Sequence, residues 1–401
     1  MAIASTDDHY PALFRDYIVR SAEVILRRTQ RHTGSFSAAD QTHVFHCLGF
    51  ALEWPQAWPV AREILLTIAP QMVQAGYHDG WIPYLERGID LALASHEPDI
   101  AAQLLLNLGW LWQLRGDLDQ AHAYYADSLT QYTVCHNEQG RALALTRIAF
   151  VSTIQCDYQT AHEQAGAALA LLDDEDTARA AVLNILGLIA RRRHQWEMAE
   201  QHYRAALSIR RSQHDLFNVA NNLRDLGCLY REAGRHDEAE VSLREAIDLY
   251  TNLDSRGEVA SALTNLANVL AVTNQMEEAL LHYRDAHQVF GELLDNLNLA
   301  VTAYNIGYAE FHLDRPSQAK SALRDAVLQW RALGNPLMEA ESLTLLGQVL
   351  LQEQQPARAQ HAFGAAQQAL REIESTPQVE ELRHTLVDLQ QQAESYGQTT
   401  T

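Results

Sequence analysis

The sequence predicts an all-α fold in which pairs of antiparallel helices follow one another as a solenoid. Alanine, leucine, glutamine, glutamate and arginine dominate the 401 residues, and all are strong helix formers. Alternating runs of valine, isoleucine and threonine, which half-buried strands require, do not occur. A pattern of small residues returns about every 40 residues along most of the chain, which indicates a repeat architecture. The hydrophobic share of 47% is ample for a packed core and excludes a disordered chain.

Residues 1–58 are expected to form a helical cap in front of the repeats. Two amphipathic segments, residues 8–31 and 38–53, carry apolar residues at helical spacing. These apolar positions are Phe14, Tyr17, Ile18, Val24, Phe45 and Leu48. We expect both helices to cover the otherwise open end of the first repeat.

Each repeat is marked by a small residue that follows a leucine or isoleucine. These residues are Ala69, Gly109, Ala149, Gly187, Gly227, Ala267, Gly307 and Gly347, so the steps are 40, 40, 38, 40, 40, 40 and 40 residues. An alanine lies twelve residues after seven of them, and Trp81 takes that place in the first. Two antiparallel helices that approach closely need small side chains where they cross. We therefore expect eight helix pairs over residues 59–371.

The turn inside each pair needs a residue that tolerates a left-handed backbone. Gly116 and Gly234 supply it in two repeats, and Asn274 and Asp314 take the same place in two others. The same position is filled by Cys156, His194 and Gln354 in three further repeats. Because these residues do not favour the left-handed conformation, we expect their turns to close in a different way.

Two segments carry the pattern most completely. They read Leu-Gly-Cys-Leu-Tyr-Arg-Glu-Ala-Gly-Arg-His-Asp-Glu-Ala-Glu from Leu226 and Leu-Gly-Trp-Leu-Trp-Gln-Leu-Arg-Gly-Asp-Leu-Asp-Gln-Ala from Leu108. This pattern resembles the tetratricopeptide repeat, whose usual period is shorter. The period near 40 resembles the long-repeat branch that includes kinesin light chains and the repeat regions of bacterial signalling ATPases. The resemblance implies a right-handed α-solenoid of helix-turn-helix repeats and a role in binding other proteins.

The last element, within residues 372–401, is expected to be a capping helix followed by a frayed tail. Pro377 is typical of a helix start. Val379, Leu382, Leu386 and Leu389 then form an apolar stripe at helical spacing. Such a helix would cover the open face of the eighth repeat.

Charge and cysteine usage restrict the partners and the compartment. The formal net charge of −21 argues against general attraction to nucleic acid or to an anionic membrane surface. The four cysteines are far apart and form no C-x-x-C motif, which favours a reducing cytoplasm. The N-terminus has no signal-peptide pattern, and the longest apolar stretch, residues 180–190, is too short to span a bilayer. We therefore expect a cytoplasmic protein that binds neither nucleic acid nor membranes.

Motifs for catalysis are missing from the sequence. The only lysine, Lys320, follows an alanine, so no phosphate-binding Gly-Lys-Ser/Thr motif exists. His43, His46 and Cys47 share one expected helix, but no second pair of metal ligands accompanies them. The acidic run 173–176 lacks the spacing of a calcium loop. We therefore expect no enzyme, no metal site and no cofactor.

The resemblance places a binding groove on the concave face, which the first helix of each pair lines. Counting the small residue as position eight, the groove positions are two, five, nine, twelve and thirteen. The N-terminal repeats place Leu106, Trp110, Phe150 and Ile154 there, the middle ones Asn184, Arg191, Arg192, Asn221, Arg224 and Arg231, and the C-terminal ones Thr264, Asn268, Tyr304, Tyr308 and Phe311.

This groove would run from apolar and aromatic residues to arginine and asparagine, and then to aromatic residues again. Asparagine can hydrogen-bond the main chain of an extended peptide, arginine can hold a carboxylate, and aromatic rings can anchor apolar side chains. The hypothesis is that the middle of the groove binds an acidic segment or the C-terminus of a partner protein. In the alternative, the four arginines pair with neighbouring carboxylates such as Asp225 and Glu232. The sequence does not decide between them.

Two functions follow from the resemblance. The first is a scaffold or adaptor that binds a partner peptide or segment in the groove. The second is a sensor or regulatory module of a signalling or defence system, which acts with a separate effector chain. The segment Gln74–Trp81 resembles the start of such sensor arrays. The sequence leaves open whether the chain also forms homo-oligomers.

Overall fold

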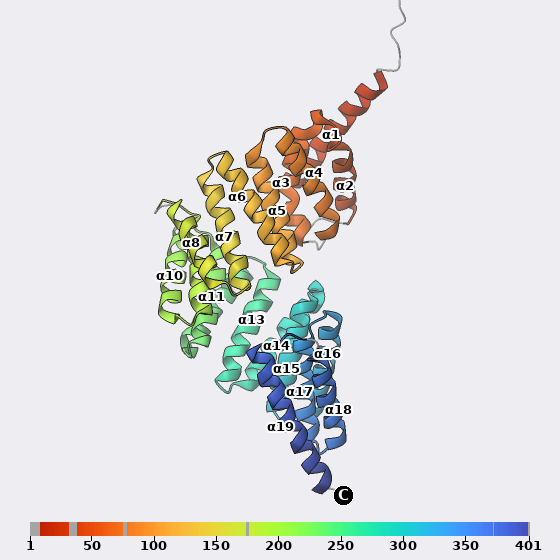
Figure 1. The fold of residues 1–401 in the computed structure, drawn as a ribbon, viewed down its shortest axis with the longest axis vertical. Helices are drawn as coiled ribbons and strands as arrows, with labels where there is room; N and C mark the ends of the chain where they lie inside the picture. Colours follow the sequence, from red (N-terminus) through yellow and green to blue (C-terminus); the bar gives the residue numbers. More distant parts are fainter. Residues whose placement is uncertain (1–8, 32–37, 75–77, 174–175, 372, 400–401) are drawn as a thin grey trace, which may run out of the picture. The chain divides into compact units, whose positions relative to one another are not determined.

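The computed structural model describes residues 9–31, 38–74, 78–173, 176–371 and 373–399. Helices α1 to α19 and a short 3-10 turn, Pro55–Ala57, make up its regular structure (Figure 1), and these ranges contain no strand. The predicted all-α fold of repeated helices is confirmed. Parts of the segment Gln74–Trp81 and of the acidic run 173–176 lie outside the described residues, as do residues 1–8 and 400–401.

The chain separates into two compact units, Met1–Ala206 and Leu207–Thr401, and α10 contains the boundary. The first unit contains α1 (His9–Arg31), α2 (Ala38–Ala51), α3 (Trp58–Gln74), α4 (His78–Ala94), α5 (Pro98–Leu114), α6 (Leu118–Val134), α7 (Glu138–Ile154), α8 (Tyr158–Ala170), α9 (Arg179–Arg192) and most of α10 (Trp196–Ser212). The second contains α11 (Leu216–Glu232), α12 (His236–Asn252), α13 (Arg256–Val272), α14 (Met276–Leu293), α15 (Asn296–His312), α16 (Pro316–Ala332), α17 (Pro336–Gln352), α18 (Pro356–Ala369) and α19 (Pro377–Thr399). The division into a cap, eight repeats and a closing helix remains a prediction.

Helix pairs approach most closely at the small residues that mark the repeats. A Cβ atom added to Gly109 would lie 2.6 Å from the ring of Tyr125, and one added to Gly187 would lie 2.7 Å from the ring of Tyr203. Both tyrosine side chains are buried. Because a larger residue would collide with a packed ring, the spacing read from the sequence reflects these crossings.

The turns within the pairs are left-handed, as expected for four of them. Gly116 has φ +82° and Gly234 has φ +76°, while Asn274 and Asp314 have φ 63° and 57°. In the first of these turns, the N–H of Asp117 donates to the carbonyl oxygen of Trp112 across 3.1 Å, which closes the end of α5.

The expectation of a different turn at Cys156, His194 and Gln354 is wrong. Their φ angles are 63°, 57° and 57°, in the same left-handed region as at the glycines. In each turn, the N–H of the residue after the left-handed one donates to the carbonyl oxygen five residues before the donor, across 2.9 Å. These bonds and the packing of the flanking helices outweigh a conformational cost of roughly 1–2 kcal/mol per residue.

The N-terminal helices bury part of the predicted apolar set. Ile18 and Leu48 lie in a core cluster that also contains Trp81, whose side chain is fully buried. Tyr17 and Val24 were expected on the buried side, but they are 68% and 62% exposed. In α1 the buried stripe follows Ile18 and Ala22, so the neighbouring face points to solvent. The side chain of Phe14 lies outside the described residues.

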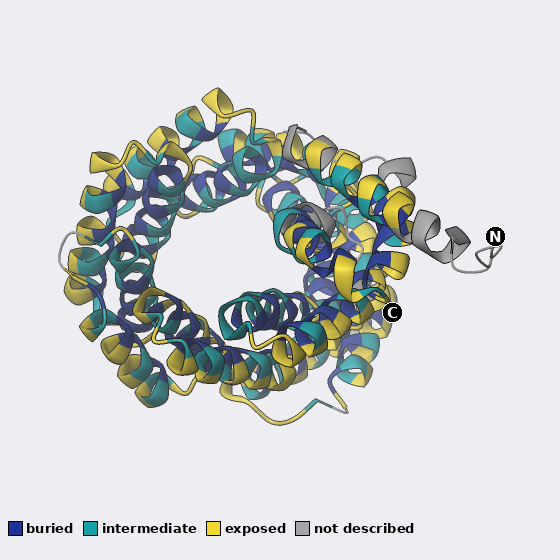
Figure 2. Ribbon diagram, turned by 90° about the horizontal axis from the view of Figure 1, so that it is seen from above, coloured by how far each residue is buried: buried dark blue, intermediate teal, exposed yellow. Residues whose placement is uncertain are grey.

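The last helix, α19, packs on α17 and α18. Val379 and Leu386 are buried, and Leu382 and Leu389 pack half-buried against the cluster formed mainly by α17 and α18. Figure 2 shows on the ribbon how far each described residue is buried. Among the helices described, none is both long enough and apolar enough to cross a bilayer.

Candidate functional site

In the second unit, the predicted groove residues lie on α11, α13 and α15, and those that share a helix are three, four or seven residues apart. These residues are Asn221, Arg224 and Arg231 on α11, Asn268 on α13, and Tyr304, Tyr308 and Phe311 on α15. Such spacing places side chains on one face of each helix. Most are half-buried, and Tyr308 is 37% exposed. Thus the side chains are fixed in part by packing and still contact solvent.

Buried tyrosines of the second helices hold the two asparagines of this face. Tyr283 of α14 donates its hydroxyl to Asn268 Oδ1 across 2.7 Å, and Tyr250 of α12 donates to Asn221 Oδ1 across 2.6 Å. Asn221 Nδ2 also donates to Asn218 Oδ1 across 3.1 Å. No described residue accepts a hydrogen bond from Asn268 Nδ2, so this amide keeps two donors for a ligand.

The tyrosines remain neutral donors at physiological pH. Burial raises the pKa of Tyr250 to about 12, although the charge of Arg224 lowers it in part. Burial also raises the pKa of Tyr283, with the Tyr308 phenol adding to the rise and Arg231 opposing it. Because each hydroxyl keeps its proton, the carbonyl oxygen of each asparagine is held and the amide group has one orientation.

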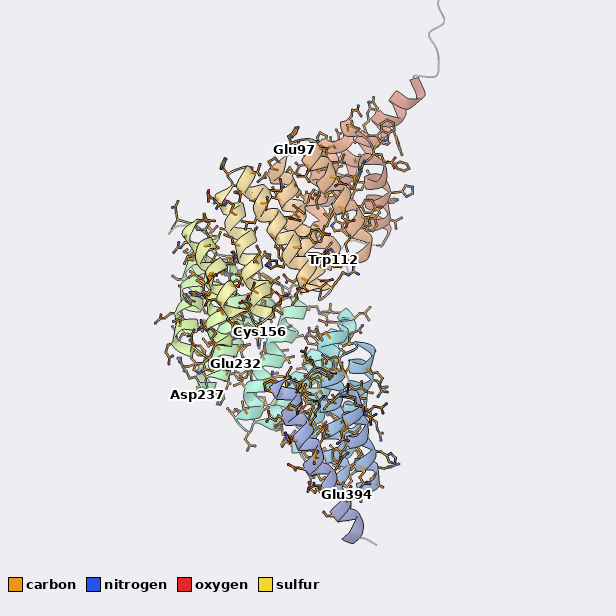
Figure 3. All side chains as sticks on the ribbon, in the orientation of Figure 1. Glu97, Trp112, Cys156, Glu232, Asp237 and Glu394 are labelled. Carbon is orange, nitrogen blue, oxygen red and sulfur yellow. The ribbon has the colours of Figure 1, made fainter. Side chains whose placement is uncertain are left out.

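The two arginines of α11 lie near carboxylates of their own helix. Arg231 contacts Glu232, labelled in Figure 3, with 3.5 Å between Nη2 and Oε1. Burial opposes the charge of Arg224, but Asp225 and Glu258 help to outweigh that effect, so its pKa is raised. The pairing of the alternative interpretation is therefore a contact for Arg231 and an electrostatic interaction for Arg224. The Arg231 side chain is 32% exposed and its contact with Glu232 is long for a hydrogen bond, so the terminal nitrogens of its guanidinium can still donate to a ligand, whereas Nε is buried.

Neighbouring helices bring these groups together within the second unit. Arg231 and Tyr308 both act electrostatically on the Tyr283 phenol, and Tyr308 acts in the same way on Tyr304. The Tyr308 ring packs on His312, with 4.3 Å between the ring centroids. We call Arg231, Asn268, Tyr304 and Tyr308 the α11–α15 surface. It combines amide donors, a guanidinium and two aromatic rings.

Two predicted residues of this unit have a different role. Thr264 was expected to line the groove, but it is buried and its hydroxyl donates to the carbonyl oxygen of Ala260 across 2.9 Å. A threonine within a helix often bonds back by one turn in this way, so its hydroxyl is not available to a ligand. Phe311 is half-buried against the core cluster of the last helices, so much of its ring supports the fold.

In the first unit, the predicted residues divide between packing and exposure. Leu106 and Trp110 pack half-buried against core clusters, Phe150 is also half-buried, and Ile154 is 46% exposed. Asn184 and Arg191 are half-buried and Arg192 is exposed. A hydrogen bond with Cys156 raises the pKa of the Tyr158 phenol, and the charge of Arg192 opposes that rise. The order of apolar, arginine and aromatic segments along one continuous groove remains a prediction.

The tyrosine hydroxyls were the functional groups that sequence reasoning missed. Tyr283 was not among the predicted groove residues. Its signal was chemical: a tyrosine in that position brings a hydroxyl that seeks a partner when the ring is buried.

Metal ligation is not favoured at the histidines of α2. Cys47 is buried, and burial raises the pKa of its thiol to about 11, whereas His43 and His46 are exposed. Within the described ranges, no group of three or more His, Cys, Asp and Glu side chains could hold a metal ion. All four cysteines are described, and each keeps its thiol.

A comparison with family models finds a match for part of the chain. The tetratricopeptide repeat family model matches residues 176–252 and 258–327. No curated protein matches the chain in sequence.

Several solved structures resemble the chain. A signal transduction ATPase with numerous domains and a tetratricopeptide repeat sensor, from Pyrococcus horikoshii, has a TM-score of 0.59 at 12% identity, covering 83% of this chain and 52% of that one. This chain thus spans about half of that protein. A Rap protein complexed with competence and sporulation factor has a TM-score of 0.56 at 12% identity, covering 95% and 98%. Aspartyl phosphate phosphatase F from Bacillus subtilis has a TM-score of 0.54 at 11% identity, covering 85% and 97%. At such identities the likeness shows the fold alone.

Proposed function

We propose that this tetratricopeptide-repeat protein is a scaffold or adaptor that binds a segment of a partner protein on the face formed by its first helices. The observation that carries the proposal is the α11–α15 surface. There Tyr283 fixes Asn268 so that its amide N–H groups remain available, close to Arg231 and the ring of Tyr308. Preorganised donors beside exposed aromatic rings are typical of surfaces that recognise peptides.

Each group of the surface matches a feature of an extended acidic segment. The amide of Asn268 would donate to a main-chain carbonyl oxygen of the partner. The guanidinium of Arg231 would hold a side-chain carboxylate or a C-terminus through charge-assisted hydrogen bonds. Tyr304 and Tyr308 would pack against apolar side chains of the same segment.

The chemistry of the surface favours binding over catalysis. Its members are one amide, one guanidinium group and two phenols, and burial raises the pKa of Tyr304 to about 12. Such a phenol is not a general base near neutral pH. Aspartyl phosphate phosphatase F shares the fold at 11% identity, and the activity in its name is not carried over to this chain. We therefore propose that this chain is not an enzyme and acts in the cytoplasm, where its cysteines remain thiols.

A sensor role is the second candidate. Two of the similar structures are described as a tetratricopeptide repeat sensor and as a complex with competence and sporulation factor. In that role, a peptide on the first-helix face would change the affinity of this chain for a separate effector protein. An adaptor would bind its partner with the same affinity whether or not a second peptide were present.

Site-specific photo-crosslinking in lysate of the source organism tests the proposal. A photoreactive phenylalanine at Tyr308 should form an adduct with a partner protein. The control places the photoreactive residue at Val241, which is 67% exposed on α12, the second helix of its pair, and should form no adduct. The adduct should decrease in the Tyr283→Phe variant, which releases Asn268, and in the Arg231→Ala variant.

Adducts of equal yield at both positions would show that the first-helix face has no special role. An adduct at Tyr308 that both variants leave unchanged would contradict the assigned roles of Asn268 and Arg231. Mass spectrometry of the crosslinked peptide identifies the partner segment. We expect an acidic or C-terminal peptide.

A further inference from the structure

A pocket of about 300 Å³ lies in the first unit between α4 and α6, and residues of α5 form part of its lining. Its base is apolar and consists of Ile89, Leu105 and Leu108, all buried. Leu93, 43% exposed, extends this apolar lining toward solvent. The volume is at the lower end of the range for ligand pockets, which suits one long side chain better than a larger molecule.

Three exposed carboxylates surround the apolar base. Glu86 and Asp90 come from successive turns of α4, and Asp127 comes from α6 on the other side. In the part of the chain that the structure describes, no lysine, arginine or histidine forms an ion pair with any of them. Their carboxylate oxygens are therefore available to a cationic ligand.

Tyr124 shows that the carboxylates act on the same space. Its ring stacks on Trp112, labelled in Figure 3, with 6.5 Å between the centroids. Burial raises the pKa of the Tyr124 phenol, and the charges of Glu86 and Asp127, from opposite sides of the pocket, raise it further. A cation in the pocket would thus interact with carboxylates of both helices.

We propose that this pocket binds an arginine side chain from a basic segment of a partner protein. The apolar base would bury the methylene stem, and the carboxylates would accept hydrogen bonds from the guanidinium group. Arginine suits the site better than lysine because its planar fork can engage carboxylates on two sides at once. The net charge of −21 attracts basic segments over longer distances. This site does not depend on the α11–α15 surface, because its residues belong to other helices of the first unit.

Fluorescence anisotropy with a labelled peptide tests the site. The probe is fluorescein-(Gly-Leu-Arg)4-amide, and its control has citrulline in place of arginine, which keeps the shape and removes the charge. We expect the arginine peptide to bind the full-length protein at least about tenfold more tightly than the citrulline peptide. Equal affinity for both peptides would overturn the proposal.

Matched variants separate the pocket from the general negative charge. Asp90→Asn/Asp127→Asn should weaken binding of the arginine peptide about tenfold. Asp248→Asn/Asp285→Asn removes the same charge from exposed positions on α12 and α14 and should leave the affinity nearly unchanged. An equal loss in both double variants would show non-specific attraction and contradict the proposal.

A third variant tests the shape of the site without changing its charge. Thr130 is an exposed residue of α6 that lines the pocket. The Thr130→Trp variant should fill the cavity and weaken binding of the arginine peptide, while circular dichroism shows an unchanged helix content. Wild-type affinity in this folded variant would exclude the pocket as the binding site.

Discussion

The His287 ring lies half-buried on α14, with 2.9 Å between its Nδ1 atom and the hydroxyl oxygen of Thr302 on α15. The Thr302 hydroxyl donates to the carbonyl oxygen of Asn298 across 2.8 Å, so the ring nitrogen is the donor in its own bond with Thr302. Burial lowers the pKa of His287 from its ordinary value of 6.5, although Leu299 and Asp325 oppose the shift. Folding therefore favours the neutral form of this ring.

Stability should depend on pH through this residue. Between the lowered pKa and 6.5 the unfolded chain binds more protons at this position than the folded one, so the free energy of unfolding falls as pH falls. His202 has a pKa lowered by burial and contributes in the same direction. The urea midpoint should therefore fall from pH 7.5 to pH 5.5, and by less in the His287→Gln variant. An equal fall in the variant and the wild type would contradict this role.

At the scale of one element, two exposed glycines separate backbone conformation from packing. A Cβ atom added to Gly116 or Gly166 would meet no atom within 4 Å. Gly116 has φ +82° at the turn after α5, whereas Gly166 lies within helix α8. Gly116→Ala should lower the free energy of unfolding by about 1–2 kcal/mol, because alanine strains the left-handed turn. Gly166→Ala should raise it by about 0.5–1 kcal/mol, because alanine favours the helix.

Thermal unfolding of both variants in parallel measures the difference. The two substitutions add the same methyl group to open space, so opposite signs isolate the backbone effect. Changes of the same sign would show that the turn conformation is not what determines stability at Gly116.

The helices and their crossings could be predicted because they depend on local chemistry and on contacts that recur with the repeat. Gly109 and Gly187 revealed the crossings, since only a small residue leaves room for the facing ring. The turn at Cys156 could not be predicted from residue type, because the packing of both flanking helices imposes its conformation. For the candidate site, helical spacing predicted which side chains share a helix face, but it did not predict their hydrogen-bond partners. The bond from Tyr283 to Asn268 joins residues 15 apart on different helices, so only the packed pair shows it.

At the scale of the whole molecule, the net charge of −21 has opposite effects on the ligands proposed for the two sites. An acidic segment that approaches the α11–α15 surface is repelled at long range and attracted only close to Arg231. A basic segment that approaches the α4–α6 pocket is attracted throughout. Salt screens charges that are more than about 10 Å apart at an ionic strength near 0.1 M, while close contacts are screened less.

The association rates of two peptides should therefore change in opposite directions with salt. From about 20 mM to about 150 mM salt, association of a glutamate-rich peptide with the surface should become faster, and association of the arginine peptide with the pocket should become slower. Stopped-flow fluorescence measures both rates on one protein sample. Arg231→Ala should increase mainly the dissociation rate of the acidic peptide, because it removes a close contact and changes the total charge little. If both association rates fell with salt, local positive potential would steer the acidic peptide, and the assumed long-range repulsion would be wrong.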